Sequence, residues 1–173
     1  FACAGGDQRN YGLKIASGDY IAFLDDDDIW LPNKIETQLI KMKHENLKMC
    51  CSDALLGRGP YNKKEKHPWY NKDTMRHALY NKHYKTKFKH SKGELPAIWS
   101  KSFLKIHNCA ILSTMMITRD IFKKVGLFSV RRSGDEDYDY WLRCLKHTSC
   151  IYIDEPLAYY DNSHGHGQNW GKK

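Results

Sequence analysis

The alternation of strand-like and helical segments along these 173 residues predicts an α/β domain. Tyr20–Leu24 has the apolar and aromatic composition of a buried strand. After Pro32, Ile35, Leu39 and Met42 recur at helical spacing, which predicts a helix to about Lys48. Because the length is that of one domain, we expect a single domain over residues 1–173.

The remaining elements follow from composition and from breaking residues. Strands are expected over residues 47–52, ended by Gly57-Arg58-Gly59-Pro60, over 109–117, and over 151–153 and 157–160, divided by Pro156. Helices are expected over 12–16, over 74–80, over 119–125 between a Thr118 cap and Gly126, and over 135–146 with an apolar stripe of Tyr138, Trp141, Leu142 and Leu145.

Composition narrows the class of protein. Hydrophobic residues make up 41% and charged residues 28%, as in ordinary globular proteins. No apolar run approaches the roughly 20 residues of a membrane span, and no signal-peptide pattern opens the chain. The six cysteines show no CxxC pair, so we expect reduced thiols and a cytoplasmic location.

The net charge of +8 comes from one stretch, residues 58–92, which we call the basic segment. It holds eleven Lys or Arg against two acidic residues, whereas the rest of the chain holds 17 against 18. Such a segment suits phosphates, an anionic membrane surface or nucleic acid. It is equally typical of a solvated insertion whose lysines serve solubility, and the sequence leaves both interpretations open.

Four carboxylates, Asp25–Asp28, follow directly on the Tyr20–Leu24 strand. Like charges at a sheet edge repel one another, and a cation relieves that repulsion. Hard oxygen ligands suit Mg²⁺ or Mn²⁺, which commonly bind together with substrate phosphates. The alternative, a solvated acidic turn that caps the next helix, explains one Asp more easily than four.

A second acidic group, Asp135, Glu136, Asp137 and Asp139, opens the last expected helix. The helix dipole favours acids in a first turn, which accounts for Asp135 and Glu136. It does not account for Asp137 and Asp139. A carboxylate held at a rigid helix start beside a metal–phosphate site would be a competent general base.

Several pieces, taken in order, resemble family 2 glycosyltransferases. They are Arg9-Asn10-Tyr11-Gly12, the run Ala16 to Pro32 with its Asp25–Asp28, Ser113 to Ile117, Gly126-Leu127-Phe128, Glu136 to Arg143 and Glu155 to Tyr160. The resemblance implies a GT-A-like, Rossmann-related mixed sheet flanked by helices. It also implies metal-dependent, inverting transfer of a sugar from a nucleotide-sugar donor, such as a UDP-sugar, to an acceptor hydroxyl.

Carried over residue by residue, the resemblance assigns the site. Arg9, Asp25, Asp26 and Asp27 would bind the donor, and Asp25 and Asp27 would hold Mn²⁺ or Mg²⁺ as a DxD motif, with His164 (or His166) as a further ligand. Asp137 would be the catalytic base, with Glu136 positioning the acceptor.

The acceptor is left open among a saccharide, a lipid-linked sugar and a protein. Peripheral contact with an anionic membrane is compatible with the basic segment. The family's first strands have no counterpart before Phe1, so we expect a chain truncated at its N-terminus.

A different class of protein remains possible on the residues alone. A metal-dependent nuclease or nucleic-acid-binding protein would also use acidic clusters and the basic segment. No recognised DNA- or RNA-binding motif is present, which counts against nucleic acid as a partner. A third possibility is an inactive relic of the fold.

Overall fold

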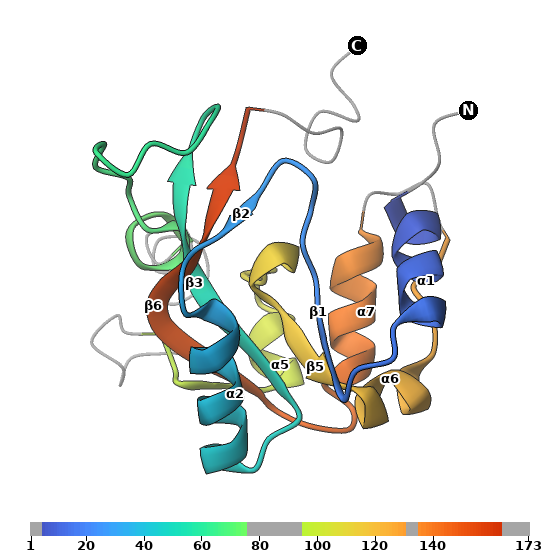
Figure 1. The fold of residues 1–173 in the computed structure, drawn as a ribbon. Coiled ribbons are helices and arrows are strands. Elements are labelled where there is room, and N and C mark those ends of the chain that lie inside the picture. The colour runs from blue at the N-terminus through green and yellow to red at the C-terminus, as the bar shows by residue number, and fades with distance from the viewer. Residues whose placement is uncertain (1–4, 76–94, 131–134, 164–173) are drawn as a thin grey trace.

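The computed structural model describes residues 5–75, 95–130 and 135–163, which form one mixed sheet with helices on both faces (Figure 1). In chain order the elements are α1 (Gly5–Ile15), β1 (Tyr20–Ala22), β2 (Ile29–Trp30), α2 (Lys34–Glu45), β3 (Met49–Gly57), the π-helical turn η1 (Tyr70–Met75), β4 (Ile98–Trp99), α5 (Lys101–Leu104), the 3₁₀ turn η3 (Leu112–Thr114), β5 (Met116–Thr118), α6 (Arg119–Val125), α7 (Glu136–Cys144) and β6 (Cys150–Asp161).

The sheet has the strand order β1-β5-β3-β6-β2, with β4 paired to β6. β3 and β6 pair in parallel, and every other pair is antiparallel. Because β5 lies antiparallel between β1 and β3, the strands β1, β3 and β6 all run in the same direction. Their C-terminal ends therefore share one edge of the sheet, which lies at the top of Figure 1.

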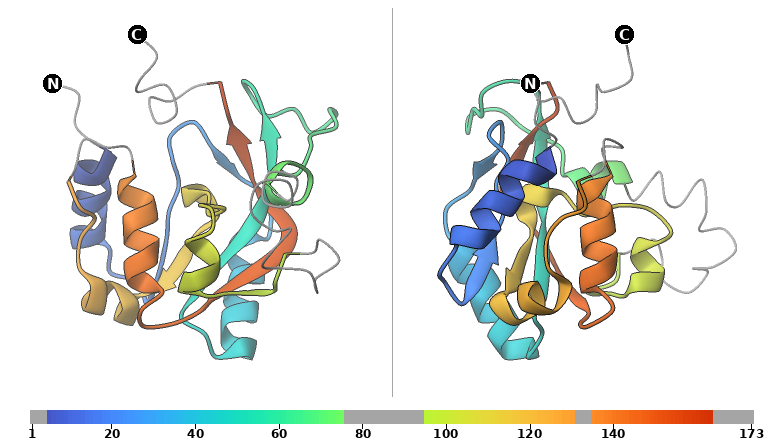
Figure 2. Two further views of the ribbon diagram at one scale, coloured as in Figure 1. Left: turned by 180° about the vertical axis from the view of Figure 1, so that it is seen from behind. Right: turned by 90° about the vertical axis from the view of Figure 1, so that its right-hand side faces the viewer.

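The two faces of the sheet carry separate hydrophobic cores, as strand alternation requires. Ile21 of β1 and Cys51 of β3 face α5, α6 and α7, whereas Tyr20 and Cys50 face α2. Figure 2 shows α2 on one side of the sheet, and η1, α5 and α7 on the other. The second acidic group of the sequence, which opens α7, therefore lies on the side of the sheet opposite α2.

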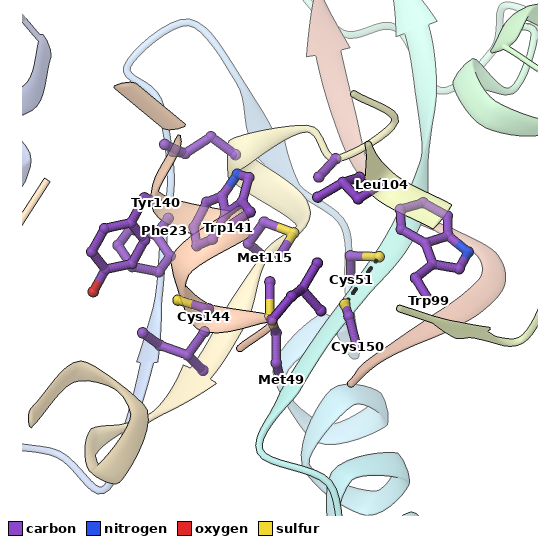
Figure 3. Close-up of a cluster of buried hydrophobic side chains, with 14 of the residues drawn as sticks. Phe23, Met49, Cys51, Trp99, Leu104, Met115, Tyr140, Trp141, Cys144 and Cys150 are labelled. Atoms are coloured by element: carbon purple, nitrogen blue, oxygen red, sulfur yellow. Dashed lines mark hydrogen bonds between the residues drawn. The ribbon is translucent and has the colours of Figure 1, made fainter. Parts of the chain in front are cut away.

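An aromatic cluster holds α7 against β1 (Figure 3). The Phe23 ring meets the Trp141 ring edge to face at 5.2 Å between centroids, and meets Tyr140 at 6.3 Å. Tyr140 stacks on Phe128 at 3.9 Å. Tyr140, Trp141 and Cys144 are fully buried, so the buried stripe of α7 includes Tyr140 and Cys144, whereas Tyr138 and Leu142 of the predicted stripe are only partly buried.

The prediction of two strands divided by Pro156 is wrong, since β6 is one strand of 12 residues. Pro156 lies opposite Asp53, where the register of β3 and β6 shifts. Proline cannot donate to a strand ladder and is tolerated at such an irregularity. The strand therefore bulges at Pro156 and continues.

Other boundaries differ from expectation in understandable ways. The short helix predicted over 12–16 belongs to α1, which begins at Gly5. Asn10 of this helix bonds the backbone of Phe128 through both amide atoms, at 3.0 and 2.7 Å. The strand predicted over 109–117 is η3 followed by the short β5. α6 has the predicted bounds, although the Thr118 side chain makes no capping hydrogen bond. The helix predicted over 74–80 overlaps the end of η1 and otherwise lies outside the described residues.

The described cysteines, Cys50, Cys51, Cys109, Cys144 and Cys150, are buried free thiols, as predicted. Cys150 approaches Cys51 with 3.7 Å between sulfurs (Figure 3). No helix of the described residues is both long and apolar enough to cross a membrane.

Candidate active site

The acidic run after β1 forms a tight turn supported from beneath by Ser113 of η3. The Asp28 N–H bonds the Asp25 carbonyl at 3.2 Å, which closes the turn. The Ser113 hydroxyl accepts the Asp25 N–H at 3.0 Å, and the Ser113 carbonyl accepts the Trp30 indole N–H at 2.9 Å. Ser113 is completely buried, so one fixed residue holds the chain both at the start of the turn and two residues beyond its end.

The four aspartates point into different surroundings. Asp26 is exposed, Asp25 and Asp27 are half-buried, and Asp28 is 6% exposed. The Asp28 carboxyl accepts the backbone N–H of Asp161, the last residue of β6, at 3.0 Å. Burial raises the pKa of Asp28 to about 7, although hydrogen bonds oppose the shift. Asp28 thus ties the acidic turn to the end of β6.

Asp27 lies in a strongly negative environment. Burial raises its pKa, and the charged groups that raise it further are the carboxylates of Asp25, Asp26 and Asp161. A divalent cation would relieve this repulsion, and carboxylate oxygens are suitable ligands. Within the described ranges, no three His, Cys, Asp or Glu side chains form a metal-ligating group. His164 lies outside the described residues.

The second acidic group lies at the N-terminus of α7. The Asp137 carboxyl accepts a hydrogen bond from the backbone N–H of the next residue, Tyr138, at 2.6 Å. Burial raises the pKa of Asp137 to about 6, while the Tyr138 N–H and the charge of Arg9 oppose that shift. A carboxylate with such a pKa is largely ionised at pH 7 and still basic enough to take a proton.

Arg9 of α1 joins the two acidic groups. Its guanidinium bonds Asp25 at 2.7 Å and Glu136 at 3.2 Å, and all three side chains are partly exposed. The charge of Asp137 also acts on Arg9. Arg9, Asp25, Glu136 and Asp137, which the sequence separates by up to 128 positions, therefore lie together at one edge of the sheet.

Arg143 joins α7 to the chain at the end of α6, and it also pairs with Asp139, as expected from the spacing of the two residues. The two side chains form an ion pair at 2.9 Å. Arg143 also donates to the carbonyls of Val125 and Leu127, both at 2.9 Å. The start of α7 is thereby held to the end of α6.

The sequence analysis assigned no role to two residues that support the acidic turn through long-range contacts, Asp161 and Ser113. Asp161 is 4% exposed, and it accepts hydrogen bonds from the Gly59 and Ser163 N–H groups at 2.9 and 2.8 Å. Its position at the end of an apolar strand, like that of Asp25, was the available signal. Ser113 opens one of the runs that carry the family resemblance, but no role was predicted for it, since its partners lie 83 and 88 positions away.

Comparison with known proteins identifies the class to which this fold and site belong. The family described as Glycosyl transferase family 2 matches residues 4–125, more than half of the chain. The chain belongs to glycosyltransferase family 2, as the resemblance predicted.

Individual relatives are similar over different shares of the chain. An uncharacterized glycosyltransferase of Rickettsia typhi is 30% identical over 156 residues, 88% of this chain and 42% of the relative. The UDP-Glc:alpha-D-GlcNAc-diphosphoundecaprenol beta-1,3-glucosyltransferase WfgD of Escherichia coli is 56% identical over 39 residues, 22% of this chain and 15% of the relative. The chain thus spans less than half the length of these relatives.

The fold also matches a solved structure. Staphylococcus aureus TarS 1–349, in complex with UDP-GlcNAc, superposes with a TM-score of 0.64 over 99% of this chain and 42% of that chain, at 13% identity. At this identity the likeness concerns the fold, and it confirms the GT-A-like α/β prediction.

Proposed function

We propose that the protein of which this chain is part transfers a sugar from a UDP-sugar to an acceptor hydroxyl, with inversion at the anomeric carbon and with a divalent metal. One observation carries the proposal: Arg9 bonds Asp25 at one acidic group and Glu136 at the other. A transferase needs its leaving-group site and its base within one substrate length, and this ion-pair bridge supports that arrangement.

The donor side is assigned to the turn after β1. Asp27, with Asp25 as its DxD partner, would hold Mn²⁺ or Mg²⁺ together with the donor diphosphate, and the metal would neutralise charge that develops on the leaving nucleotide. Arg9 and Asp26 complete the donor-binding set. The name of WfgD refers to UDP-Glc and the TarS structure contains UDP-GlcNAc, which favours a uridine nucleotide here.

The acceptor side is assigned to the start of α7. In this mechanism the Asp137 carboxylate takes the proton of the acceptor hydroxyl. At the same time the acceptor oxygen forms the new bond to the anomeric carbon. The bond to the leaving diphosphate breaks on the opposite face, so the configuration inverts. Glu136, fixed by Arg9, positions the acceptor.

The acceptor class follows from charge and from the relatives. The basic segment suits a phosphate-bearing acceptor at an anionic membrane, and the name of WfgD refers to a diphosphoundecaprenol acceptor. We therefore favour a lipid-linked saccharide, glycosylated at the cytoplasmic surface of a membrane, over a free saccharide or a protein.

The test uses the full-length protein with UDP-glucose or UDP-GlcNAc and Mn²⁺. Asp27→Asn should abolish metal-dependent binding of UDP in calorimetry. Asp137→Asn should keep that binding and lose transfer, the pattern of a group needed only in the transition state. Asp19→Asn, an exposed carboxylate before β1, serves as the matched control. Unchanged UDP affinity in Asp27→Asn, or stabilisation by a DNA oligomer in place of UDP, would contradict the proposal.

A further inference from the structure

Lys34, the first residue of α2, carries a buried charge. The residue is 1% exposed, and the ion pairs formed by the described residues do not include it. Burial lowers the pKa of Lys34 to about 8, while the thiols of Cys50 and Cys51 act in the opposite direction. The side chain is therefore mostly an ammonium at pH 7. Burying such a charge without a carboxylate partner costs free energy, so the fold by itself gains little from it.

Two contacts hold the Lys34 ammonium. It donates a hydrogen bond to Oε1 of Gln38, one turn further along α2, at 2.6 Å. It also lies 4.5 Å from the centre of the ring of Trp30, the last residue of β2. An indole ring attracts a cation over its face, and the attraction is stronger where water is excluded. The charge of Lys34 therefore orients one side chain of α2 and one of the strand that leads into it.

Gln38 and Trp30 both bond the backbone of η3. Gln38 donates from Nε2 to the Thr114 carbonyl at 2.7 Å, and the Trp30 indole N–H donates to the Ser113 carbonyl at 2.9 Å. Gln38, Ser113 and Thr114 are all completely buried. The Ser113 hydroxyl in turn accepts the Asp25 N–H at 3.0 Å. The two side chains that Lys34 orients thus fix the residue that holds the start of the acidic turn.

This network acts on the turn from one side of the sheet. α2 covers the face opposite α7, so the support by Lys34 comes from the face that does not carry the second acidic group (Figure 2). Asp25 is consequently held twice: at its N–H by Ser113, and at its carboxylate by Arg9. A binding site is most effective when its ligands are held in place before the ligand arrives, and buried hydrogen bonds beneath the site provide that rigidity.

We propose that the Lys34 ammonium, acting through Trp30 and Gln38, positions the Asp25–Asp28 turn to bind the metal and the donor diphosphate. This inference rests on the proposed function and deepens it by assigning the support of the donor half. Lys34 acts through other side chains, so it is a positioning residue.

The experiment measures UDP binding in the presence of Mn²⁺ by calorimetry, with the full-length protein. Lys34→Met removes the charge and keeps an unbranched side chain. It should weaken the affinity for UDP by about 2- to 30-fold, the range expected from the loss of a cation–π contact. The donor KM should rise by a similar factor, and the acceptor KM should stay unchanged.

Two control variants on the same helix separate positioning from other effects. Lys41→Met removes an exposed charge and should leave the affinity for UDP as it is. Met42→Ala empties a site in the core beneath α2, where Met42 is 2% exposed, and should lower the free energy of unfolding in urea. It should nevertheless bind UDP with unchanged affinity, because Met42 lies outside the network of Lys34.

Trp30→Phe tests the same path without altering the buried charge. It keeps a ring next to Lys34 and removes the N–H that bonds Ser113, so it should also weaken the affinity for UDP. Because both residues act on η3, the double variant Lys34→Met/Trp30→Phe should lose less affinity than the product of the two single losses. Independent contributions would multiply.

The possible results distinguish the inference from the proposed function. Unchanged UDP affinity in Lys34→Met or in Trp30→Phe, an equal loss in Met42→Ala, or single losses that multiply in the double variant would overturn the role of Lys34. In each of these cases the unaltered protein still binds UDP with Mn²⁺, and the proposed function stands. Absence of metal-dependent UDP binding in the unaltered protein would remove the proposed function, and the inference with it.

Discussion

Phe23 and Trp141 join the two acidic groups from below, with 5.2 Å between ring centroids and 74° between ring planes. Phe23 precedes Asp25 by two residues, and Trp141 follows Asp137 by one turn of α7. This edge-to-face contact and the ion pairs of Arg9 both connect the acidic turn after β1 to α7. The relative placement of the two acidic groups thus rests on the core as well as on surface charge.

Truncating this contact should therefore loosen the fold. Phe23→Ala should lower the free energy of unfolding by roughly 3–5 kcal/mol, because it empties a site of fully buried aromatic neighbours. Phe23→Leu keeps most of the volume and should lower it by much less. Urea unfolding followed by tryptophan fluorescence measures both, and equal losses would contradict the packing argument.

The activity of the protein should fall at acid pH as Asp137 protonates. Burial raises the pKa of Asp137 to about 6, so the proposed role as base predicts that transfer declines below that pH. Arg9 opposes the shift, so Arg9→Gln should move the acid limb of the pH–rate profile to higher pH. Arg9→Lys keeps the positive charge and should leave the limb nearly in place. A limb that does not move in Arg9→Gln would separate Arg9 from the base.

Stability should respond to pH through Asp28 in the direction opposite to a typical aspartate. Its folded pKa of about 7 lies above the ordinary value of 3.8, so the folded protein binds the extra proton between these values. Its contribution to stability is present below about pH 4 and is lost as the pH rises toward 7.

Asp28→Asn should remove that decline. Asparagine can still accept the Asp161 N–H but cannot ionise. Unfolding in urea with a chelator, at several pH values between 4 and 8, measures the difference between the two proteins. A difference that does not change with pH would show that Asp28 has the same pKa in the folded and unfolded states.

The basic segment should give salt-dependent membrane binding if it meets a phosphate-bearing surface. Sedimentation with anionic liposomes should weaken steeply from low to high salt. The triple change of Lys63, Lys64 and Lys66 to Gln should weaken it as well. The same change at Lys41, Lys43 and Lys105, which are exposed elsewhere, is the control. Equal sedimentation with neutral liposomes would leave only a solubility role.

Local signals in the sequence predicted the elements whose ends are set locally. α6 has the predicted bounds because Gly126, at a φ of 78°, ends it. α1 was predicted too short because its polar residues resemble a loop, and Asn10 finds its partner in the distant backbone of Phe128. The residue that ends α6 can be read locally, whereas the contact that supports α1 joins residues far apart in the sequence.

The same distinction applies to the site. Asp25–Asp28 and Glu136–Asp137 are contiguous motifs and could be recognised, although their catalytic and metal-binding roles stay predictions. The contacts of Ser113 with the acidic turn could not be recognised, since its partners lie 83 and 88 residues away.

The register shift at Pro156 divides the pairing of β3 with β6 into two stretches. Up to Ile153 the pairing of β3 with β6 is regular, and this portion contributes Cys51 and Tyr152 to the core. Beyond it the pairing resumes in a new frame that ends at Asp161. Because the bulge already separates the two registers, an insertion or deletion in β6 after Pro156 should leave the pairing up to Ile153 unchanged. The end of the sheet at Asp161 can therefore change in length or composition without disturbing the core pairing at Cys51 and Tyr152.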